Sequence, residues 1–295
     1  MKTANTRNQF FNKKNTAFSL IEISIVIIIV GLLISVILAS SNILDQFKIS
    51  TARTLTVSSP VNGIKDSVLW LESSLKKSFD ASEQKNGANI TAWYDIRESV
   101  SKNNAVQSNS SNYPIYSNTT VHIHAVKFDG VNSYLNIANA SFLNNTDYTI
   151  FIVEQRESNK ADNYFVGDIS APEENVTNNN LVLGYSSDKT VKHSQSFDNS
   201  YTSSLINYKA ADKTPKIFSF IHDSAVGKKT YVNGMLTASS ADTNNLKNIS
   251  TLKIGKSYNG KIGELIIFVR ALTTEERQSI EDYLGKKWSS KITRS

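Results

Sequence analysis

The sequence predicts an N-terminal transmembrane α-helix followed by an all-β antiparallel sandwich that ends in a short C-terminal helix. Three features of the 295-residue chain support this prediction. Residues 23–44 carry no charge, short apolar runs alternate with turn residues from about Ile90 onward, and a helix-capping sequence begins at Thr273. A chain of this length corresponds to one or two domains, and its 40% hydrophobic content is sufficient for a buried core.

The composition excludes several classes of protein. The chain has no cysteine, which rules out disulfide frameworks, thiolate zinc sites and cysteine nucleophiles. Its formal net charge is +6, but four of its 32 basic residues lie within positions 1–17, which contain no acidic residue. The remainder of the chain is nearly neutral and lacks a basic stripe, so no nucleic-acid partner is expected.

The uncharged segment is the first element along the chain. Residues 23–39 read ISIVIIIVGLLISVILA, and with their flanks they approach the ~20 residues that a helix needs to cross a bilayer. Basic residues precede the segment, so the positive-inside rule predicts a cytoplasmic N-terminus and an external C-terminal part. Glu22 lies inside the apolar run, where an unpaired carboxylate is costly, and its position therefore indicates a charged partner.

The residues around Glu22 carry a resemblance to a known family. Residues 13–22, KKNTAFSLIE, resemble the type IV prepilin cleavage and methylation segment, in which basic residues and a small residue precede Phe-Ser/Thr-Leu-Ile-Glu. The resemblance covers residues 13–45 and implies cleavage between Ala17 and Phe18 by prepilin peptidase, followed by N-methylation of Phe18. It also implies that Glu22 pairs with the N-terminal amine of a neighbouring pilin-like subunit during assembly.

Two departures from that family pattern affect the prediction. Ala17 stands where the family usually has glycine, which predicts slower processing. The apolar helix contains Gly31 but none of the kinking prolines common in pilins, which predicts a straighter helix. A plain signal peptide or signal anchor is the alternative, although the small-residue cleavage sites within the run match poorly.

The rest of the chain is predicted to form a linker and then a series of strands. The helix is expected to continue to residue 57, and breakers such as Pro60 and Gly63 indicate a linker over residues 58–65. Residues 64–75 are compatible with either a short helix or a first strand. Apolar patterning and turn residues predict strands in the ranges 121–128, 134–137, 148–154, 163–167, 181–185, 216–222, 230–237, 251–255 and 263–270.

Two local signals complete the predicted head. Asn233 and Gly234 form the dipeptide that is typical of a two-residue hairpin turn. Thr273 and Glu276 have the spacing of a capping box, which predicts the start of the final helix. That helix has apolar residues on one face, interpreted as core packing: Ile280, Tyr283, Leu284 and Trp288.

Short motifs in the head resemble the concanavalin A-like, laminin-G-like jelly roll. They occur in order over residues 66–288, as LWLE at 69–72, AWYD at 92–95, VKFDGVNSYL at 126–135, YVNG at 231–234 and GKIGELIIF at 260–268. The resemblance implies two packed antiparallel sheets whose curved face or rim loops often bind glycan or protein, sometimes with calcium. Asp129 and Asn132, which lie in a turn, are the candidates for a calcium site.

The head carries no recognisable catalytic motif, and the chain is interpreted as a non-enzyme. Glycosidases of this fold need paired carboxylates on one strand, whereas Glu264 stands alone in its run. His122 and His124 lie two apart on a predicted strand and so face the same side, but no third ligand completes a metal site. The isolated acidic residues are interpreted as turn formers or solvated charges.

These observations predict a leader over residues 1–17, a helix over 18–57, a linker over 58–65, a jelly roll over 66–288 and a tail over 289–295. The predicted function is a non-enzymatic pilin-like or pseudopilin-like subunit of a pilus or type II secretion-like assembly. Its head would bind glycan or a surface protein, and its helix would contact lipid as a single pass of the bacterial inner membrane. Two alternatives stay open: a membrane protein that does not polymerise and, less favoured, a glycoside hydrolase.

Overall fold

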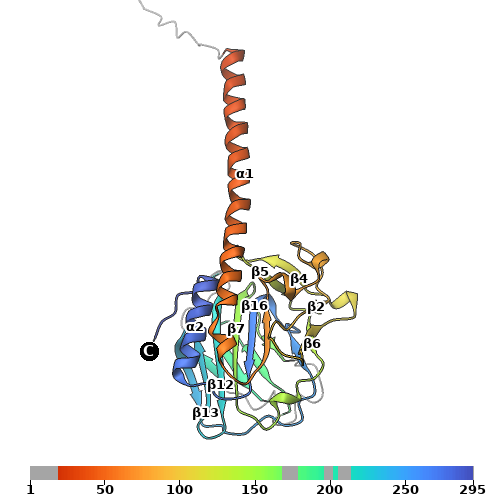
Figure 1. The fold of residues 1–295 in the computed structure, drawn as a ribbon, viewed down its shortest axis with the longest axis vertical. Helices are drawn as coiled ribbons and strands as arrows, with labels where there is room; N and C mark the ends of the chain where they lie inside the picture. The colour runs from red at the N-terminus through yellow and green to blue at the C-terminus, as the bar shows by residue number, and fades with distance from the viewer. Residues whose placement is uncertain (1–18, 168–178, 196–201, 205–213, 295) are drawn as a thin grey trace, which may run out of the picture. The chain divides into compact units, whose positions relative to one another are not determined.

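The computed structural model describes residues 19–167, 179–195, 202–204 and 214–294, with side chains described except at 36–42 and 202–204. Ala17 and Phe18, the expected processing residues, lie outside this set. The chain divides into two compact units, Met1–Leu44 and Asp45–Ser295. Helix α1, Leu20–Val57, belongs to the first unit up to Leu44 and to the second from Asp45 onward (Figure 1).

The prediction of a transmembrane helix is wrong. Among the residues that the structure describes, no helix is both long enough and apolar enough to cross a membrane. The predicted single-pass inner-membrane location rested on this helix and is wrong on the same finding.

The second unit is a sandwich of two antiparallel sheets, as predicted. In sheet A the described strands follow the order β14-β13-β12-β7-β16-β5-β4, and β1 also pairs with β16 (Figure 1). These strands are β1 (Ser67–Glu72), β4 (Ile115–Asn118), β5 (His124–Asp129), β7 (Tyr148–Arg156), β12 (Lys216–Asp223), β13 (Gly227–Val232), β14 (Met235–Ser240) and β16 (Asn259–Phe268).

Sheet B has the order β11-β10-β9-β8-β15-β6-β3-β2. Its strands are β2 (Ala92–Trp93), β3 (Ala105–Val106), β6 (Leu135–Ile137), β8 (Asn163–Val166), β9 (Val182–Tyr185), β10 (Thr190–Ser194), β11 (Thr202–Ser204) and β15 (Leu252–Ile254). Short 3-10 helices lie between strands and at the start of the head: η1 (Pro60–Gly63), η2 (Lys76–Ser78), η3 (Ala81–Glu83), η4 (Ser110–Asn112) and η5 (Ser141–Leu143).

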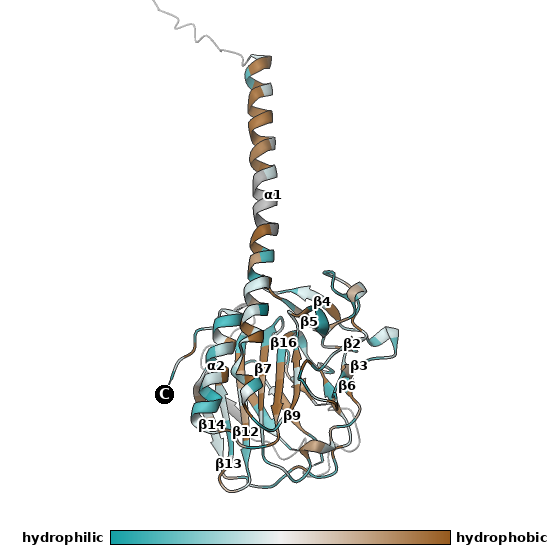
Figure 2. Cartoon of the chain, in the orientation of Figure 1, coloured by the Kyte–Doolittle hydropathy of each residue, from teal (hydrophilic) through white to brown (hydrophobic). Residues whose placement is uncertain are grey.

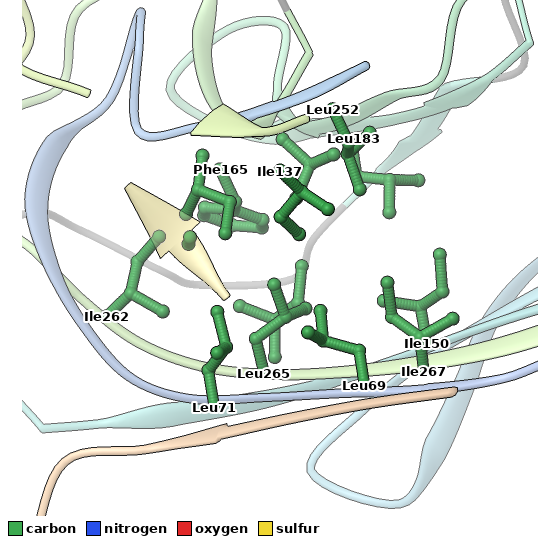
Figure 3. Close-up of a cluster of buried hydrophobic side chains, with 14 of the residues drawn as sticks. Leu69, Leu71, Ile137, Ile150, Phe165, Leu183, Leu252, Ile262, Leu265 and Ile267 are labelled. Carbon is green, nitrogen blue, oxygen red and sulfur yellow. The ribbon is translucent and has the colours of Figure 1, made fainter. Parts of the chain in front are cut away.

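The main core lies between the two sheets, where inward-facing side chains meet (Figure 3). Sheet A contributes Leu69, Leu71, Ile150, Ile262, Leu265 and Ile267, and sheet B contributes Ile137, Phe165, Leu183 and Leu252. Each of these side chains is at most 2% exposed. Removing apolar surface from water stabilises the fold by roughly 25 cal/mol per Å². Because successive side chains of a strand point to opposite faces, each sheet has an inner face in this core and an outer face that points away from it.

The predicted local signals are confirmed in most places. Asn233 and Gly234 have φ of 49° and 83°, the left-handed pair that a type I′ hairpin requires. Residues 64–75 contain strand β1 and not a helix. The strand predicted from residue 121 begins only at His124, because His122 has φ of 62° and interrupts the extended backbone.

The outer face of sheet A is covered by helix α2, Thr274–Trp288, which lies beside β12 (Figure 1). The predicted capping box is present, since Thr273 Oγ1 accepts from the Glu276 N–H and the Glu276 carboxylate accepts from the Thr273 N–H. All four predicted apolar residues of α2 belong to a second buried cluster, which also includes Ala52, Trp70, Phe151, Val153, Ile217 and Ile266. Strand β7 is therefore buried along its whole length.

A buried ionic network fastens α2 to sheet A. Glu72 and Glu264 lie directly opposite each other on β1 and β16. The Lys287 ammonium donates to Glu72 Oε1 at 2.5 Å and to Glu264 Oε2 at 2.9 Å, and all three side chains are fully buried. Trp70 Nε1 and the Tyr283 hydroxyl each donate to Glu264 Oε1 at 2.7 Å. The network therefore joins the last helix to two adjacent strands through charge and hydrogen bonds.

Lys287→Met tests the importance of this network. The substitution leaves Glu72 and Glu264 as uncompensated buried carboxylates, so we expect the free energy of unfolding to fall by about 3–5 kcal/mol. Urea unfolding of the full chain measures the change. Lys286→Met is the matched control, because Lys286 is exposed on the same helix and its loss should cost less than about 0.5 kcal/mol. Equal stability of the two variants would contradict the expectation.

Candidate functional site

A groove of about 410 Å³ lies on the outer face of sheet B. It is lined by Val106, Gln107, Ser108, Tyr134, Asn136, Thr251 and Lys253. Three of these side chains form a row across neighbouring strands, because Lys253 lies opposite Asn136 on β15 and β6, and Asn136 lies opposite Val106 on β3. The residues that flank them on each strand point into the core. Because side chains alternate along a strand, the row itself lies on the outer face of sheet B.

The half-buried ring of Tyr134 stands at this groove with two lysine side chains near it. Lys253 Nζ lies 5.7 Å and Lys256 Nζ lies 4.8 Å from the ring centroid. The backbone of Tyr134 is held on both sides, since its N–H donates to Asn112 O at 3.1 Å and its carbonyl accepts from Gln107 Nε2 at 3.1 Å. These two hydrogen bonds fix the backbone of Tyr134 and so hold its ring at the groove.

The side chain of Asn136 adds a polar group to the groove. Its Oδ1 atom is buried and has no hydrogen-bond partner among the described residues. An amide offers both a donor and an acceptor group, which suits a ligand rich in hydroxyls. No acidic side chain is among the described residues that line the groove. The described groove residues offer an aromatic ring, hydrogen-bonding groups and positive charge to a ligand.

The predicted calcium candidates form a turn. Asp129 Oδ1 accepts from the backbone N–H groups of Val131, Asn132 and Ser133 and from the Ser133 hydroxyl, at 2.8–3.0 Å. Burial alone would raise the pKa of Asp129, but these hydrogen bonds bring it below its usual value. Asn132 Nδ2 donates to Ser111 O at 2.9 Å. Among the described residues, no group of three His, Asp or Glu side chains is placed to hold a metal ion.

Glu22 has a local partner at the start of α1. Its Oε2 atom accepts from the Ser19 N–H at 2.8 Å, while the Ser19 hydroxyl accepts from the Ile21 N–H at 3.3 Å. A carboxylate that caps its own helix N-terminus is stabilised by the helix dipole as well as by the hydrogen bond. The pairing of Glu22 with the amine of a neighbouring subunit stays a prediction.

His122 and His124 do not share a strand as predicted, because β5 begins at His124. His122 precedes the strand and its Nδ1 lies 2.5 Å from Asp45 Oδ1. His124 stacks on Tyr116 instead, with ring centroids 4.5 Å apart and planes within 8°. Burial lowers the pKa of His124. The two imidazoles thus make different contacts, although both lie within the electrostatic reach of Asp45.

The interpretation of the acidic residues as solvated charges is wrong for Glu264 and Glu281. Both are buried, Glu264 in the Lys287 network and Glu281 against Arg277 at 2.7 Å. Sequence analysis also missed Glu154, whose carboxylate accepts from the hydroxyls of Tyr185 and Tyr258 inside the core. Burial raises the pKa of Glu154 despite these hydrogen bonds. These contacts join residues far apart in the chain, so no local pattern reveals them.

A second polar cluster lies at the edge of the core near the start of β7. The Tyr148 hydroxyl is 3.0 Å from His193 Nε2, and burial holds the pKa of His193 well below its usual value. Nearby on β13, Lys228 Nζ donates to Asp242 Oδ2 at 2.6 Å. Burial alone would raise the pKa of Asp242, but hydrogen bonds from Lys228 and Asn244 lower it to about 2. The ion pair ties β13 to the segment that follows β14.

Comparison with known proteins identifies the fold. No protein-family model matches the chain, and no curated protein matches its sequence. Solved β-sandwich structures do match. One is a botulinum neurotoxin type C structure described by its interaction with two ganglioside molecules (12% identity, TM-score 0.52, 76% of this chain and 52% of that chain). Another is Trypanosoma rangeli sialidase in complex with sialic acid (15% identity, TM-score 0.50, 76% and 33%).

A third match is domain 4 of an extracellular arabinanase from Geobacillus stearothermophilus, in complex with arabinotriose (14% identity, TM-score 0.48, 74% of this chain and 98% of that chain). The chain thus spans about a third of the sialidase and half of the toxin chain. At these identities the likeness shows the fold alone. The head is a lectin-like, jelly-roll type of β-sandwich, as its sequence motifs predict. These comparisons lend no support to the prepilin segment.

The Lys228–Asp242 pair predicts a specific acid sensitivity. Because the pKa of Asp242 is lowered to about 2 on folding, its contribution to stability is present above the unfolded value near 4. It is lost as the pH falls from about 4 towards 2. We expect Asp242→Asn to be less stable at pH 7 and to lose less stability over that range. Thermal unfolding between pH 7 and pH 2 measures both effects.

Asp223→Asn is the matched control, because Asp223 ends β12 and has no ion pair among the described residues. A pH profile of Asp242→Asn that parallels the parent protein would contradict the assignment.

Proposed function

We propose that this chain is a non-enzymatic glycan-binding protein whose head takes a sugar in the sheet B groove. The observation that carries the proposal is the Tyr134 ring standing beside the Asn136 amide in an open groove of about 410 Å³. A sugar ring presents an apolar C–H face to an aromatic side chain and hydroxyl groups to an amide. The volume is within the range of small-ligand sites.

The comparisons support the same class of function without identifying a ligand. Two of the matched structures are described with sialic acid or ganglioside, and one with arabinotriose. A shared fold hosts many functions, so the proposed glycan binding rests on the residues of this chain's own groove. The absence of acidic side chains among the described groove residues favours binding over hydrolysis, because glycosidases need a pair of carboxyl groups at the scissile bond.

Tyr134→Ala tests the groove. We expect a glycan array to show binding by the parent chain and at least a tenfold loss for Tyr134→Ala, since stacking on an aromatic ring is removed. Tyr134→Phe keeps the ring and should retain most binding. Tyr231→Ala is the matched control, because Tyr231 lies in sheet A under Arg277. Full binding by Tyr134→Ala would exclude the groove, and silence across the array would favour a protein partner.

Calcium and hydrolysis are tested in the same assay. We propose that binding needs no cofactor, because the Asp129 carboxylate already accepts four hydrogen bonds within its turn. Glycan binding that is lost when a chelator is added and restored by calcium would instead favour a calcium ion at Asp129 and Asn132. Release of reducing sugar from a bound polysaccharide would favour the glycoside hydrolase alternative.

A separate observation favours a second role for the helix. In the first unit the large apolar side chains of α1 between residues 20 and 34 are exposed, from Val30 at 47% to Leu20 at 87%, and this stretch is mostly brown in Figure 2. Exposed apolar surface of this extent marks an interaction site. We propose that the chain is a pilin-like or pseudopilin-like subunit, processed by prepilin peptidase between Ala17 and Phe18 and methylated on Phe18. Helices of neighbouring subunits would then cover one another.

Glu22→Gln separates assembly from helix capping. A glutamine still accepts the Ser19 N–H but has no charge, so it keeps the cap and loses the proposed ion pair with a neighbouring amine. We expect crosslinking between copies in the native cell to fall several-fold in both Glu22→Gln and Glu22→Ala. Parent-level crosslinking in Glu22→Gln would show that charge is not needed. Mass spectrometry of the mature N-terminus must show methylated Phe18; an intact Met1 would contradict the processing step.

A further inference from the structure

We infer that the sheet B groove selects acidic glycans, those carrying a carboxylate or sulfate, over their neutral counterparts. This inference rests on the proposed glycan-binding function and names the ligand class for the same groove. Its basis is the placement of two ammonium groups around the one aromatic ring that lines the described groove.

The two lysines reach the ring from different positions of the chain. Lys253 lies within β15 and lines the groove directly, while Lys256 follows the strand by two residues. Their ammonium nitrogens lie over the Tyr134 ring, 5.7 and 4.8 Å from its centroid, so a ligand that contacts this ring would lie close to both. Lys256 makes no ion pair with any side chain that the structure describes. Its charge is therefore placed to meet a ligand.

The remaining described groove residues do not oppose that charge. They are polar or apolar, and none carries a negative charge. The Asn136 amide lies in the same cross-strand row as Lys253, so a sugar hydroxyl that accepts from Asn136 Nδ2 would bring a ring substituent toward the ammonium group. Asn136 thereby fixes the orientation of the ring, and the lysines discriminate by charge.

Charge-assisted hydrogen bonds are roughly twice as strong as neutral ones, and an ammonium group supplies three donors without geometric restriction. An acidic sugar would gain such bonds, and a neutral sugar of the same shape would gain only ordinary ones. Because the groove is open to solvent, the preference should weaken as salt screens the charges. A measurable salt dependence therefore distinguishes acidic selection from stacking alone.

The test is a glycan array that pairs each uronate, sialylated or sulfated glycan with its neutral counterpart, probed with the full chain. We expect the acidic member of the bound pairs to be favoured by at least tenfold at 50 mM salt, with the ratio falling at 500 mM. Lys253→Gln, Lys256→Gln and the double variant should remove the preference stepwise. Lys256→Arg keeps the charge and should restore it, and Lys229→Gln on sheet A is the matched control.

The outcomes separate the two proposals. Equal binding of acidic and neutral partners, unchanged in the double Gln variant, would overturn acidic selection and leave glycan binding in the groove intact. Binding to no member of the array would overturn both. An acidic preference that survives the double Gln variant but is lost in Tyr134→Ala would also overturn the role assigned to the lysines, because charge would then come from elsewhere in the site.

Discussion

The contact between Lys287 and the two carboxylates beneath it is the constraint on which the head depends. Glu72 and Glu264 face each other across adjacent strands, and two like charges in a buried position repel each other strongly. The Lys287 ammonium of α2 lies 2.5 and 2.9 Å from these carboxylates and offsets the repulsion between them. Thr56 Oγ1 also accepts from Lys287 Nζ at 2.8 Å, so the end of α1 joins the same network.

This network also determines which surface is available for binding. Helix α2 covers the outer face of sheet A, where its apolar side chains pack on Trp70 and Ile266. The outer face of sheet B instead carries the row of Val106, Asn136 and Lys253. The sandwich is therefore asymmetric: one sheet binds the chain's own terminal helix, and the other offers a polar groove with an aromatic ring.

The acidic residues show how environment decides chemical role. Glu154 is buried against two tyrosine hydroxyls and Glu264 against a lysine and aromatic donors, whereas the exposed Asp129 accepts from backbone N–H groups of its own turn. Each carboxylate is occupied by donors from the chain itself. None of these three lines the described groove.

Local sequence signals predicted most of the longer strands, the Asn233-Gly234 turn and the capping box at Thr273, because each depends on neighbouring residues and backbone preference. They did not predict the strands β3, β4, β10 and β11. The same signals overstated α1 as a membrane span and placed His122 in a strand that begins two residues later. Tertiary structure alone decided the partners of Glu264 and the row of Val106, Asn136 and Lys253. Those contacts depend on the register between strands and on helix docking, which bring together residues separated by tens to hundreds of positions.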